Sequence, residues 1–450
     1  VWGQEMADTM QRETNTTVPF GMIVSAWGGT EIEMWQPNKT INEYCKTVAG
    51  ESIASRRQGN GAIYNGMIVP FLSTTIKAAI WYQGENNVGE CACVNGTDGR
   101  GCISLGPDAC GNVLNGTGYA CQMGNLIRQW RVGWSAVAGT TNPLFPFGLV
   151  TLADGTSEGH QVNMAAFRRA QTGGYGIMPN PAWPNTFVAL GHDIGDPTSP
   201  DNWDKRGPGC KIGGVDYPYQ MSYDARPMYA SHGVQYYTNY FMGDIHPRSK
   251  QHVGRRLAAA SYQAIYGTPI GVTTGPLISG CGVKQDQDRH QENNWELTLS
   301  FNQTLLGPDA VHVWKPSSTS QAAQIGLFME CLLYNGSVIE LNSTGPCQFA
   351  RAAATASVLE AQYNGSIWFP VTLPSNGPPF LYPNGSRTPM ASRVTLVIPK
   401  YLPNSRTPVQ ITGIRYAWSA VPCCPDTERG VLPCPPGSCP ITTYNSSLPA

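Results

Sequence analysis

Four short segments bring together residue types that could do chemistry. The paired glycines Gly28 and Gly29 leave backbone N–H groups without a Cβ in the way, so that these donors can point into a site. The run from Gln83 to Asn87 places amide and carboxylate groups side by side, and two further segments combine aspartate with histidine. Each segment alone is weak evidence, because paired glycines usually form a turn and such Asp/His loops are usually solvated. The four segments are residues 27–35, 83–87, 192–196 and 243–247.

A parallel α/β sheet is the structure that would position these segments. Over residues 1–265, short apolar runs alternate with longer stretches of helical periodicity, which predicts parallel strands joined by helices. In such sheets the reactive groups lie in the loops at the carboxyl ends of the strands. The predicted strands are residues 19–26, 77–83, 146–153 and 186–191, and the predicted helices are residues 64–72, 119–134, 160–171 and 249–266.

The character of the sequence changes near residue 270, where we expect a domain boundary. Residues 271–450 are expected to form a β-rich accessory domain, because strand-like runs separated by Asn-Gly and Pro-Gly turns follow one another there. A Cys-rich insertion over residues 88–118 interrupts the first domain, residues 1–270, and a Cys/Pro-rich tail lies near the end of the second. The strands predicted in the second domain are residues 295–301, 326–334, 393–399 and 409–418.

Charge is scarce in this chain of 450 residues. Charged residues make up 13% of it, against about 25% in an average soluble protein. The 29 Lys and Arg nearly balance the 30 Asp and Glu, for a formal net charge of −1. No strong electrostatic field would hold such a chain on nucleic acid or on an anionic membrane surface. A nucleic-acid partner is therefore not expected. The sequence also lacks a run of about 18 apolar residues, so a membrane span is not expected either.

Cysteines and glycosylation sequons indicate an oxidising compartment. Many of the 14 cysteines gather in residues 91–121 and 423–439. Such clusters could bind zinc, but no histidine lies at ligand spacing, so disulfides are favoured and no metal is expected. We therefore expect a secreted, cell-surface or lysosomal protein that carries N-glycans. The sequons are at Asn15, Asn38, Asn95, Asn115, Asn302, Asn335, Asn342, Asn364, Asn384 and Asn445.

The motifs are more specific in their order along the chain than one at a time. Residues 23–30 (IVSAWGGT), 64–70 (YNGMIVP), 81–87 (WYQGENN) and 244–251 (DIHPRSKQ) together resemble the sialate O-acetylesterase family. The resemblance implies a flavodoxin-like SGNH-hydrolase core of three α/β/α layers, with its first strand missing here and a β-rich domain attached. It also implies a serine esterase that needs no cofactor and works through an acyl-enzyme. Its substrate would be a sialic acid in a sialoglycoconjugate or a related acetylated sugar, from which it removes O-acetyl groups.

The same resemblance assigns roles to individual residues. His246 matches the base that takes the proton of the serine, and Asp244 is the candidate for orienting it. The family's acid stands three residues before the histidine, where this chain has Gly243. Asp244 therefore orients the base by a different route or is merely solvated, with a Ser-His dyad as the alternative. Arg168 would either pair with the substrate's carboxylate or lie on a helix surface. The candidates for oxyanion and substrate binding are Gly28, Gly29, Gln83, Gly84, Glu85 and Asn86.

The family's nucleophile is missing from these residues. Its Gly-Gln-Ser-Asn-Met block would precede Val1, where the sequence reads as the middle of a helix. We expect a separate N-terminal chain that carries this block after proteolysis, or a sequence that is partial. The alternative is a non-catalytic extracellular glycoprotein, structural or carbohydrate-binding, on a degenerate esterase fold. Ser157 fits the Gly-x-Ser-x-Gly elbow of α/β-hydrolases but also suits a helix cap, and Ser25 is expected to be a buried strand residue.

Overall fold

The chain divides into two compact units, each described by itself. Unit 1 comprises Val1–Ala153, Glu158–Gly191 and Ser249–Thr273, and unit 2 comprises Asp154–Ser157, His192–Arg248 and Thr274–Ala450. The computed structural model describes residues 1–15, 17, 19–46, 59–88, 93–95, 102–104, 118–153, 164–194, 211–212, 215–216, 245–247, 250–268, 273–285, 294–306, 311–313, 359–363, 367–370, 393–400, 408, 411–416 and 441–443.

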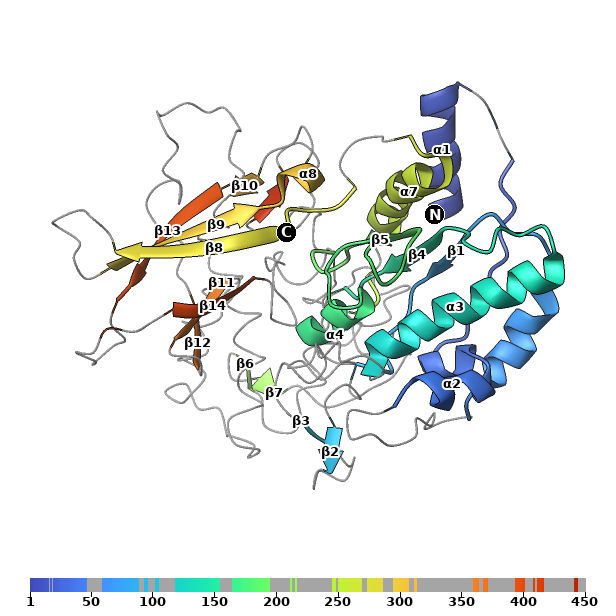
Figure 1. The fold of residues 1–450 in the computed structure, drawn as a ribbon, viewed down its shortest axis with the longest axis horizontal. Helices are drawn as coiled ribbons and strands as arrows, with labels where there is room; N and C mark the ends of the chain where they lie inside the picture. The colour runs from blue at the N-terminus through green and yellow to red at the C-terminus, as the bar shows by residue number, and fades with distance from the viewer. Residues whose placement is uncertain are drawn as a thin grey trace. The chain divides into compact units, whose positions relative to one another are not determined.

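A parallel three-stranded sheet is the centre of unit 1 (Figure 1). Its strands are β1 (Ala79–Trp81), β4 (Phe147–Val150) and β5 (Thr186–Ala189), in the order β1-β4-β5. The register places Phe147 of β4 opposite Ala79 of β1. All residues of β4 and β5 are buried, as expected for parallel strands that are covered on both faces. The predicted α/β class is therefore confirmed, together with three of its four predicted strands.

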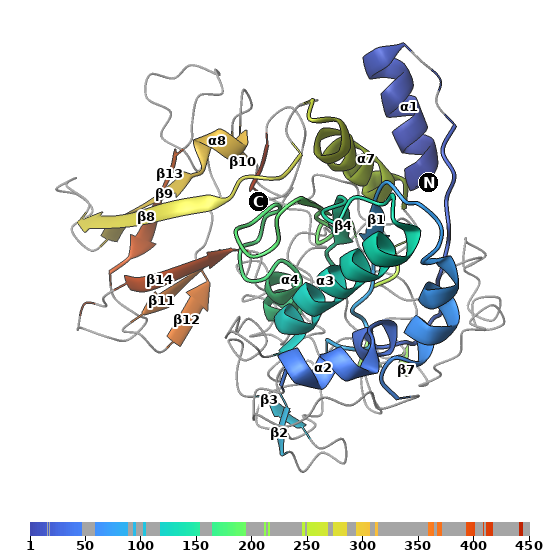
Figure 2. The same ribbon diagram turned by 45° about the vertical axis from the view of Figure 1, so that its right-hand side comes forward.

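Helices cover both faces of this sheet. On one face α7 (Lys250–Tyr266) contacts β4 and β5, and α1 (Trp2–Thr14) packs against α7. On the other face lies α3 (Gly118–Ala138), whose Trp130 meets the ring of Trp81 edge-on at a centroid distance of 5.6 Å. Figures 1 and 2 both draw the strands between the α1–α7 pair and α3. This layering brings the loops at the carboxyl ends of β1 and β4 close to α3 and to α4 (Met164–Gln171).

Shorter helical elements complete unit 1. The 3-10 helix η1 (Ile32–Trp35) precedes α2 (Asn38–Tyr44), and η2 (Tyr64–Ile68) continues into η3 (Val69–Phe71). The last two occupy the helix predicted at residues 64–72. The predicted helices near residues 119–134, 160–171 and 249–266 are present as α3, as α4 (Met164–Gln171) and as α7.

The strand predicted at residues 19–26 is wrong. These residues form neither helix nor strand, and the side chains of Met22, Val24 and Trp27 are 47%, 77% and 57% exposed. Ser25, expected to be a buried strand residue, is half-buried and donates its hydroxyl to the carbonyl oxygen of Met67 at 3.1 Å. An apolar run becomes a buried strand only where a neighbouring strand pairs with it, and β1 pairs only with β4 among the described strands.

The described part of unit 2 consists mainly of antiparallel strands. Strands were correctly predicted near residues 295–301, 393–399 and 409–418, whereas residues 326–334 lie outside the described residues. One sheet has the order β13-β9-β8 and another the order β12-β11-β14. The elements are β8 (Ile278–Gln285), β9 (Asn294–Phe301), α8 (Gln303–Leu306), β13 (Arg393–Pro399), β11 (Leu359–Tyr363), β12 (Ile367–Pro370), β14 (Ile411–Tyr416), and the pairs β10 (Val311–Val313) with β15 (Ile441–Thr443) and β6 (Lys211–Ile212) with β7 (Val215–Asp216).

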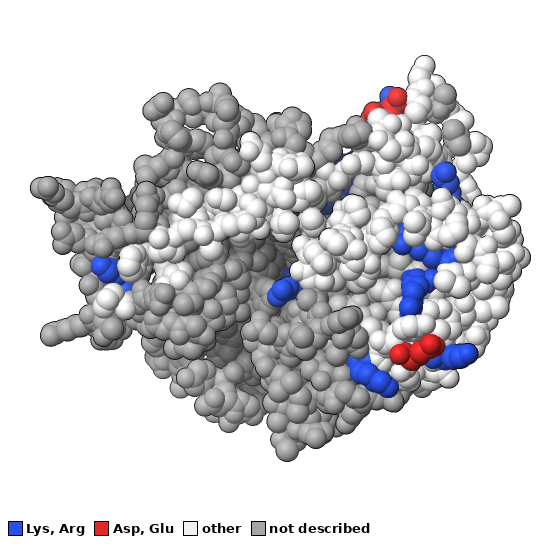
Figure 3. Space-filling view, viewed as in Figure 1, with Lys and Arg blue, Asp and Glu red and all other residues white. Residues whose placement is uncertain are grey.

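A small hairpin lies within the Cys-rich insertion. Its strands are β2 (Cys93–Asn95) and β3 (Cys102–Ser104), which pair in antiparallel fashion. On the face drawn in Figure 3, the described surface is mostly uncharged and its Lys, Arg, Asp and Glu side chains are scattered. Within the described residues, no helix combines the length and the apolar character that crossing a membrane requires.

Candidate active-site loops

The turn that follows β1 is fixed by its glycine. Gly84 has a φ of +149°, in the region that favours glycine, and a Cβ placed on it would lie 2.5 Å from Phe167 of α4. The Gly84 carbonyl accepts hydrogen bonds from the backbone N–H groups of Asn87 and Val88, both at 2.9 Å. A side chain at Gly84 would therefore push this turn away from α4.

Gln83 joins this turn to the loop of residues 27–32. Its Nε2 donates to the carbonyl oxygen of Thr30 at 3.0 Å and to Oδ1 of Asn87 at 2.8 Å. Its Oε1 accepts a hydrogen bond from the hydroxyl of Tyr119 at 2.9 Å. Both amide hydrogens of Gln83 are thus engaged within the protein. The geometry makes Gln83 a residue that holds two loops together, and its role in oxyanion binding stays a prediction.

A chain of buried hydrogen bonds continues from the turn to α3. Asn87 is 2% exposed, accepts from the backbone N–H of Ile32 at 2.9 Å, and donates its Nδ2 to Oε2 of Glu33 at 3.0 Å. Gln122 of α3 donates its Nε2 to Oε1 of Glu33 at 2.7 Å. The sequence did not single out Asn87, Glu33 or Gln122 as site residues. The available signals were the position of Asn87 within the segment 83–87 and that of Glu33 within the segment 27–35, whereas nothing in the sequence pointed to Gln122.

Burial changes the acid–base properties of this network. It raises the pKa of Glu33, while the hydrogen bonds from Asn87 and Gln122 act in the opposite direction. Burial likewise raises the pKa of Tyr119, and the negative charge of Glu85 adds to that effect. The phenol of Tyr119 therefore stays protonated at neutral pH and acts as a hydrogen-bond donor.

Two side chains of α4 hold the carboxyl end of β4. Arg168 is 8% exposed, and it donates Nε to the carbonyl oxygen of Leu152 and Nη2 to that of Ala153, both at 2.9 Å. Gln171 accepts from the backbone N–H of Leu152 at 2.9 Å and donates to the carbonyl oxygen of Gln83 at 3.1 Å. Arg168 is therefore not a helix-surface residue, because burial and main-chain contacts fix it. Its contact with a substrate carboxylate stays a prediction.

The remaining candidates of unit 1 lie in the same two loops. Gly28 is exposed, and Gly29 follows it in a turn with a φ of +73°. Glu85 and Asn86 are half-buried in the turn after Gly84. The structure thus brings together two of the four segments that the sequence singled out. The binding roles of these residues stay predictions.

The predicted base and its orienting acid belong to unit 2. His246 is half-buried between two buried neighbours, whereas Asp244 and Ser157 lie outside the described residues. In the segment 192–196, His192 and Asp193 are buried, with exposed fractions of 7% and 0%. The catalytic roles of His246 and Asp244 stay predictions.

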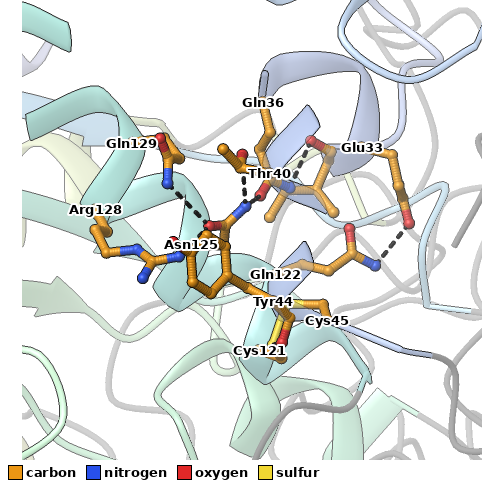
Figure 4. The surroundings of a disulfide bond; sticks show 11 residues. Glu33, Gln36, Thr40, Tyr44, Cys45, Cys121, Gln122, Asn125, Arg128 and Gln129 are labelled. Carbon is orange, nitrogen blue, oxygen red and sulfur yellow. Dashed lines mark hydrogen bonds between the residues drawn. A yellow bond between two sulfur atoms is a disulfide. The ribbon is translucent and has the colours of Figure 1, made fainter. Parts of the chain in front are cut away.

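A disulfide lies beside the network of unit 1. Cys45, directly after α2, is bonded to Cys121 of α3, and Gln122 is the next residue along that helix. Figure 4 shows the hydrogen bond from Gln122 to Glu33 next to this disulfide. The bond confirms that the chain carries a disulfide, and it links one cysteine of the 91–121 cluster to a cysteine outside that cluster.

The described sequons differ in their surroundings. Asn15 and Asn38 are exposed. Asn302 is half-buried, and its Oδ1 accepts a hydrogen bond from the backbone N–H of Leu305 at 3.2 Å. The side chains of the other sequons lie outside the described part of the chain.

Comparison with known proteins relates the chain to carbohydrate esterases. The family model for carbohydrate esterases described as sialic acid-specific acetylesterases matches residues 2–94, which include both loops of the network. The chain is 27% identical to the sialate O-acetylesterase of Pongo abelii over 371 residues, which covers 78% of this chain and 56% of that protein. It is 28% identical to the sialate O-acetylesterase of Homo sapiens over 283 residues, covering 62% of this chain and 40% of that protein.

A solved structure is similar to this chain in fold. The crystal structure of a carbohydrate acetylesterase from Xanthomonas citri aligns with this chain at a TM-score of 0.50 and 19% identity. The alignment covers 100% of this chain and 63% of the Xanthomonas citri protein. The sialate O-acetylesterase of Rattus norvegicus is 26% identical, with 80% of this chain and 61% of that protein covered. The chain thus spans about half the length of the curated relatives it matches. These comparisons confirm its resemblance to the sialate O-acetylesterase family of carbohydrate esterases.

Proposed function

We propose that this chain is part of a serine carbohydrate esterase that removes O-acetyl groups from sialic acids or related acetylated sugars. The observation that carries the proposal is the joining of the loop 27–32 to the turn 84–88, which follows β1. Gln83 and Asn87 make this junction through buried hydrogen bonds to Thr30 and Ile32. Loops at the carboxyl ends of parallel strands are where such sheets bind their substrates. The similarity to sialate O-acetylesterases supports the choice of substrate.

The reaction would proceed through an acetyl-enzyme. A serine Oγ attacks the acetyl carbonyl carbon while His246 takes the serine proton, and Asp244 orients the imidazole. The backbone N–H groups of Gly28 and Gly29, with the amide of Asn86, would stabilise the oxyanion, whereas both side-chain amide hydrogens of Gln83 are already used. The C–O bond to the sugar then breaks and the sugar oxygen receives the proton held by the histidine. Water, deprotonated by the same histidine, releases acetate from the serine ester.

The serine would lie on a Gly-Gln-Ser-Asn-Met segment outside these 450 residues, as a separate N-terminal chain or as part of a longer one. Among the described strands β1 pairs only with β4, and its open edge supports this proposal. The backbone N–H of Ala79 bonds to Pro146 on the β4 side, so by the alternation of a parallel ladder the N–H and C=O of Ile80 point to the other edge. A further parallel strand would pair there. The exposed apolar side chains of residues 19–27 are likewise a surface that a further segment would cover.

The wider architecture and location follow from the same proposal. We place residues 1–270 in an SGNH-type, flavodoxin-like core and residues 271–450 in a β-rich accessory domain. The protein would be secreted, displayed at the cell surface or lysosomal, and would carry N-glycans. The disulfide between Cys45 and Cys121 and the exposure of the sequons at Asn15 and Asn38 support this location.

Replacement of the proposed base tests the activity. In the full-length protein, His246→Ala should lower the rate of acetate release from O-acetylated sialic acid by about 10³-fold or more, because the serine would lose its proton acceptor. His252→Ala, which changes a histidine of α7, is the control and should leave the rate nearly unchanged. A His246→Ala variant with the wild-type rate would remove this residue from the mechanism.

The composition of the purified protein tests the origin of the nucleophile. Intact mass and N-terminal sequencing, under reducing and non-reducing conditions, should find the Gly-Gln-Ser-Asn-Met segment with this chain. Ser157→Ala should then leave acetate release unchanged. Absence of that segment together with absence of acetate release would favour the non-catalytic glycoprotein, whereas loss of activity in Ser157→Ala would make Ser157 the nucleophile.

A further inference from the structure

One side chain touches both loops of the candidate site. The Asn87 Oδ1 accepts two hydrogen bonds, from the backbone N–H of Ile32 at 2.9 Å and from Nε2 of Gln83 at 2.8 Å. Its Nδ2 donates to the Glu33 carboxylate, at 3.0 Å to Oε2. The amide therefore accepts on one side and donates on the other, which neither a carboxylate nor an aliphatic side chain can do.

Glu33 connects this side chain to α3. Its side chain is 1% exposed, and its carboxylate accepts from two residues: Asn87 is nearer to Oε2, at 3.0 Å, than to Oε1, at 3.4 Å, and Gln122 donates to Oε1 at 2.7 Å. Gln122 adjoins the disulfide-bonded Cys121, so the far end of the chain of hydrogen bonds lies on a helix that is covalently tied to α2. A buried carboxylate that accepts from two amides holds both amides in place, because displacing either one leaves part of the carboxylate's charge without a hydrogen-bond donor.

The position of Asn87 affects the residues next to it in sequence and the loop that it contacts. Asn87 follows directly after Asn86, one of the proposed oxyanion donors, and Ile32 lies three residues after Gly29 in the other loop. A hydrogen-bond donor for an oxyanion must be held to within a few tenths of an ångström of its working position. Movement of Asn87 would shift both sets of donors relative to each other.

We propose that Glu33 and Asn87 are positioning residues, which lock the turn 84–88 onto the loop 27–32 and so set the spacing of the oxyanion donors. The effect on catalysis rests on the proposed esterase function, whereas the locking of the two loops does not. Neither residue touches the acetyl group in this scheme. Their substitution should therefore lower kcat and leave KM nearly unchanged.

Exchange of the two functional groups gives a sharp test in the full-length protein. Asn87→Asp places a carboxylate against Glu33, and Glu33→Gln places an amide nitrogen against one of its two amide donors. In the double variant, the new amide at position 33 would accept from Gln122 and donate to the new carboxylate at position 87. That carboxylate would still accept from Ile32 and Gln83. Each single variant should lower kcat roughly 10²-fold, as a displacement of about 1 Å does. The double variant should recover most of that loss.

Hydrogen exchange separates the lock from the activity. In Asn87→Asp the backbone N–H of Ile32 should exchange at least about 10-fold faster than in the wild type, and the double variant should restore its protection. Gln129→Ala is the control, because Gln129 lies on the same helix but donates to Oδ1 of Asn125 at 3.3 Å instead of to the turn, and Arg128 remains as a second donor to that oxygen. It should change neither kcat nor exchange at Ile32.

The outcomes distinguish failure of the lock from failure of the proposed function. Wild-type kcat and wild-type protection at Ile32 in both single variants would overturn the lock. Lost protection without rescue in the double variant would overturn the assigned pairing. A wild-type protein that releases no acetate, yet shows the expected exchange pattern, would overturn the esterase proposal and leave the lock standing.

Discussion

Residues 19–36 form one continuous segment whose first half exposes apolar side chains and whose second half is buried, its polar side chains included. In the first half the apolar side chains of Met22, Val24 and Trp27 are about half or more exposed. In the second half the polar side chains of Glu33 and Gln36 are 1% and 0% exposed. For these five side chains, polarity alone would predict the reverse.

The difference shows that burial in this segment depends on whether a side chain has hydrogen-bonding or packing partners, and not on its polarity alone. The polar groups of the second half can be buried because they have hydrogen-bond donors in the turn after β1 and on α3, such as Asn87 and Gln122. The first half has apolar side chains but no strand to pair with among the described residues. A buried polar network of this kind costs desolvation free energy and is worth keeping where it specifies a geometry. We therefore interpret the second half as a segment that fixes the geometry of the candidate site. The first half is interpreted as an apolar surface that a further segment would cover.

The largest effect should come from a tryptophan in the buried half. Trp35 is 3% exposed, meets the ring of Trp81 edge-on at 5.5 Å, and donates its indole N–H to Oγ1 of Thr30 at 2.8 Å. Trp35→Ala should lower the free energy of unfolding by about 3–5 kcal/mol, because it leaves a cavity and an unpaired hydroxyl acceptor. Trp27→Ala is the matched control in the exposed half and should cost less than about 1 kcal/mol. Urea denaturation of both variants measures the contrast, and equal losses would contradict it.

A smaller effect should appear as a pH dependence of the buried carboxylate. Burial raises the pKa of Glu33 in the folded state above its ordinary value. Protonation therefore favours the folded state, and the contribution of Glu33 to stability should fall as pH rises from that ordinary value through the raised pKa. Each tenfold difference in proton affinity between the folded and unfolded states corresponds to about 1.4 kcal/mol.

Comparison with a variant that cannot titrate at this position measures that effect. The free energy of unfolding of the wild type relative to Glu33→Gln should decrease between about pH 4 and pH 7 in urea titrations. A difference that is independent of pH, or that increases with pH, would show that hydrogen bonds outweigh desolvation at Glu33.

The sequence predicted elements whose signal is local and missed contacts whose partners are distant. The apolar runs of β4 and β5 and the periodicity of α3 were sufficient to place those elements. The same kind of apolar run at residues 19–26 failed, because strand formation there depends on a pairing partner that the local pattern does not contain. Gln122 and Glu33 are 89 residues apart, so no periodicity could indicate that they bond. Of the two alternatives for Arg168, the helix-surface position is wrong for a related reason, since the carbonyl groups that hold it belong to the segment after β4.

The smallest effect in this chain should come from the exposed half. Val24 is 77% exposed, so Val24→Ser should change the free energy of unfolding of the 450-residue chain by less than about 0.5 kcal/mol. In a longer protein that contains the proposed nucleophile segment, the same change should cost about 1–2 kcal/mol, because the valine would then lie in an apolar contact. Urea denaturation of both forms gives the two numbers. Equal and small losses in both would mean that the added segment leaves residues 19–27 uncovered, and the proposed docking of a further strand beside β1 would lose its apolar support.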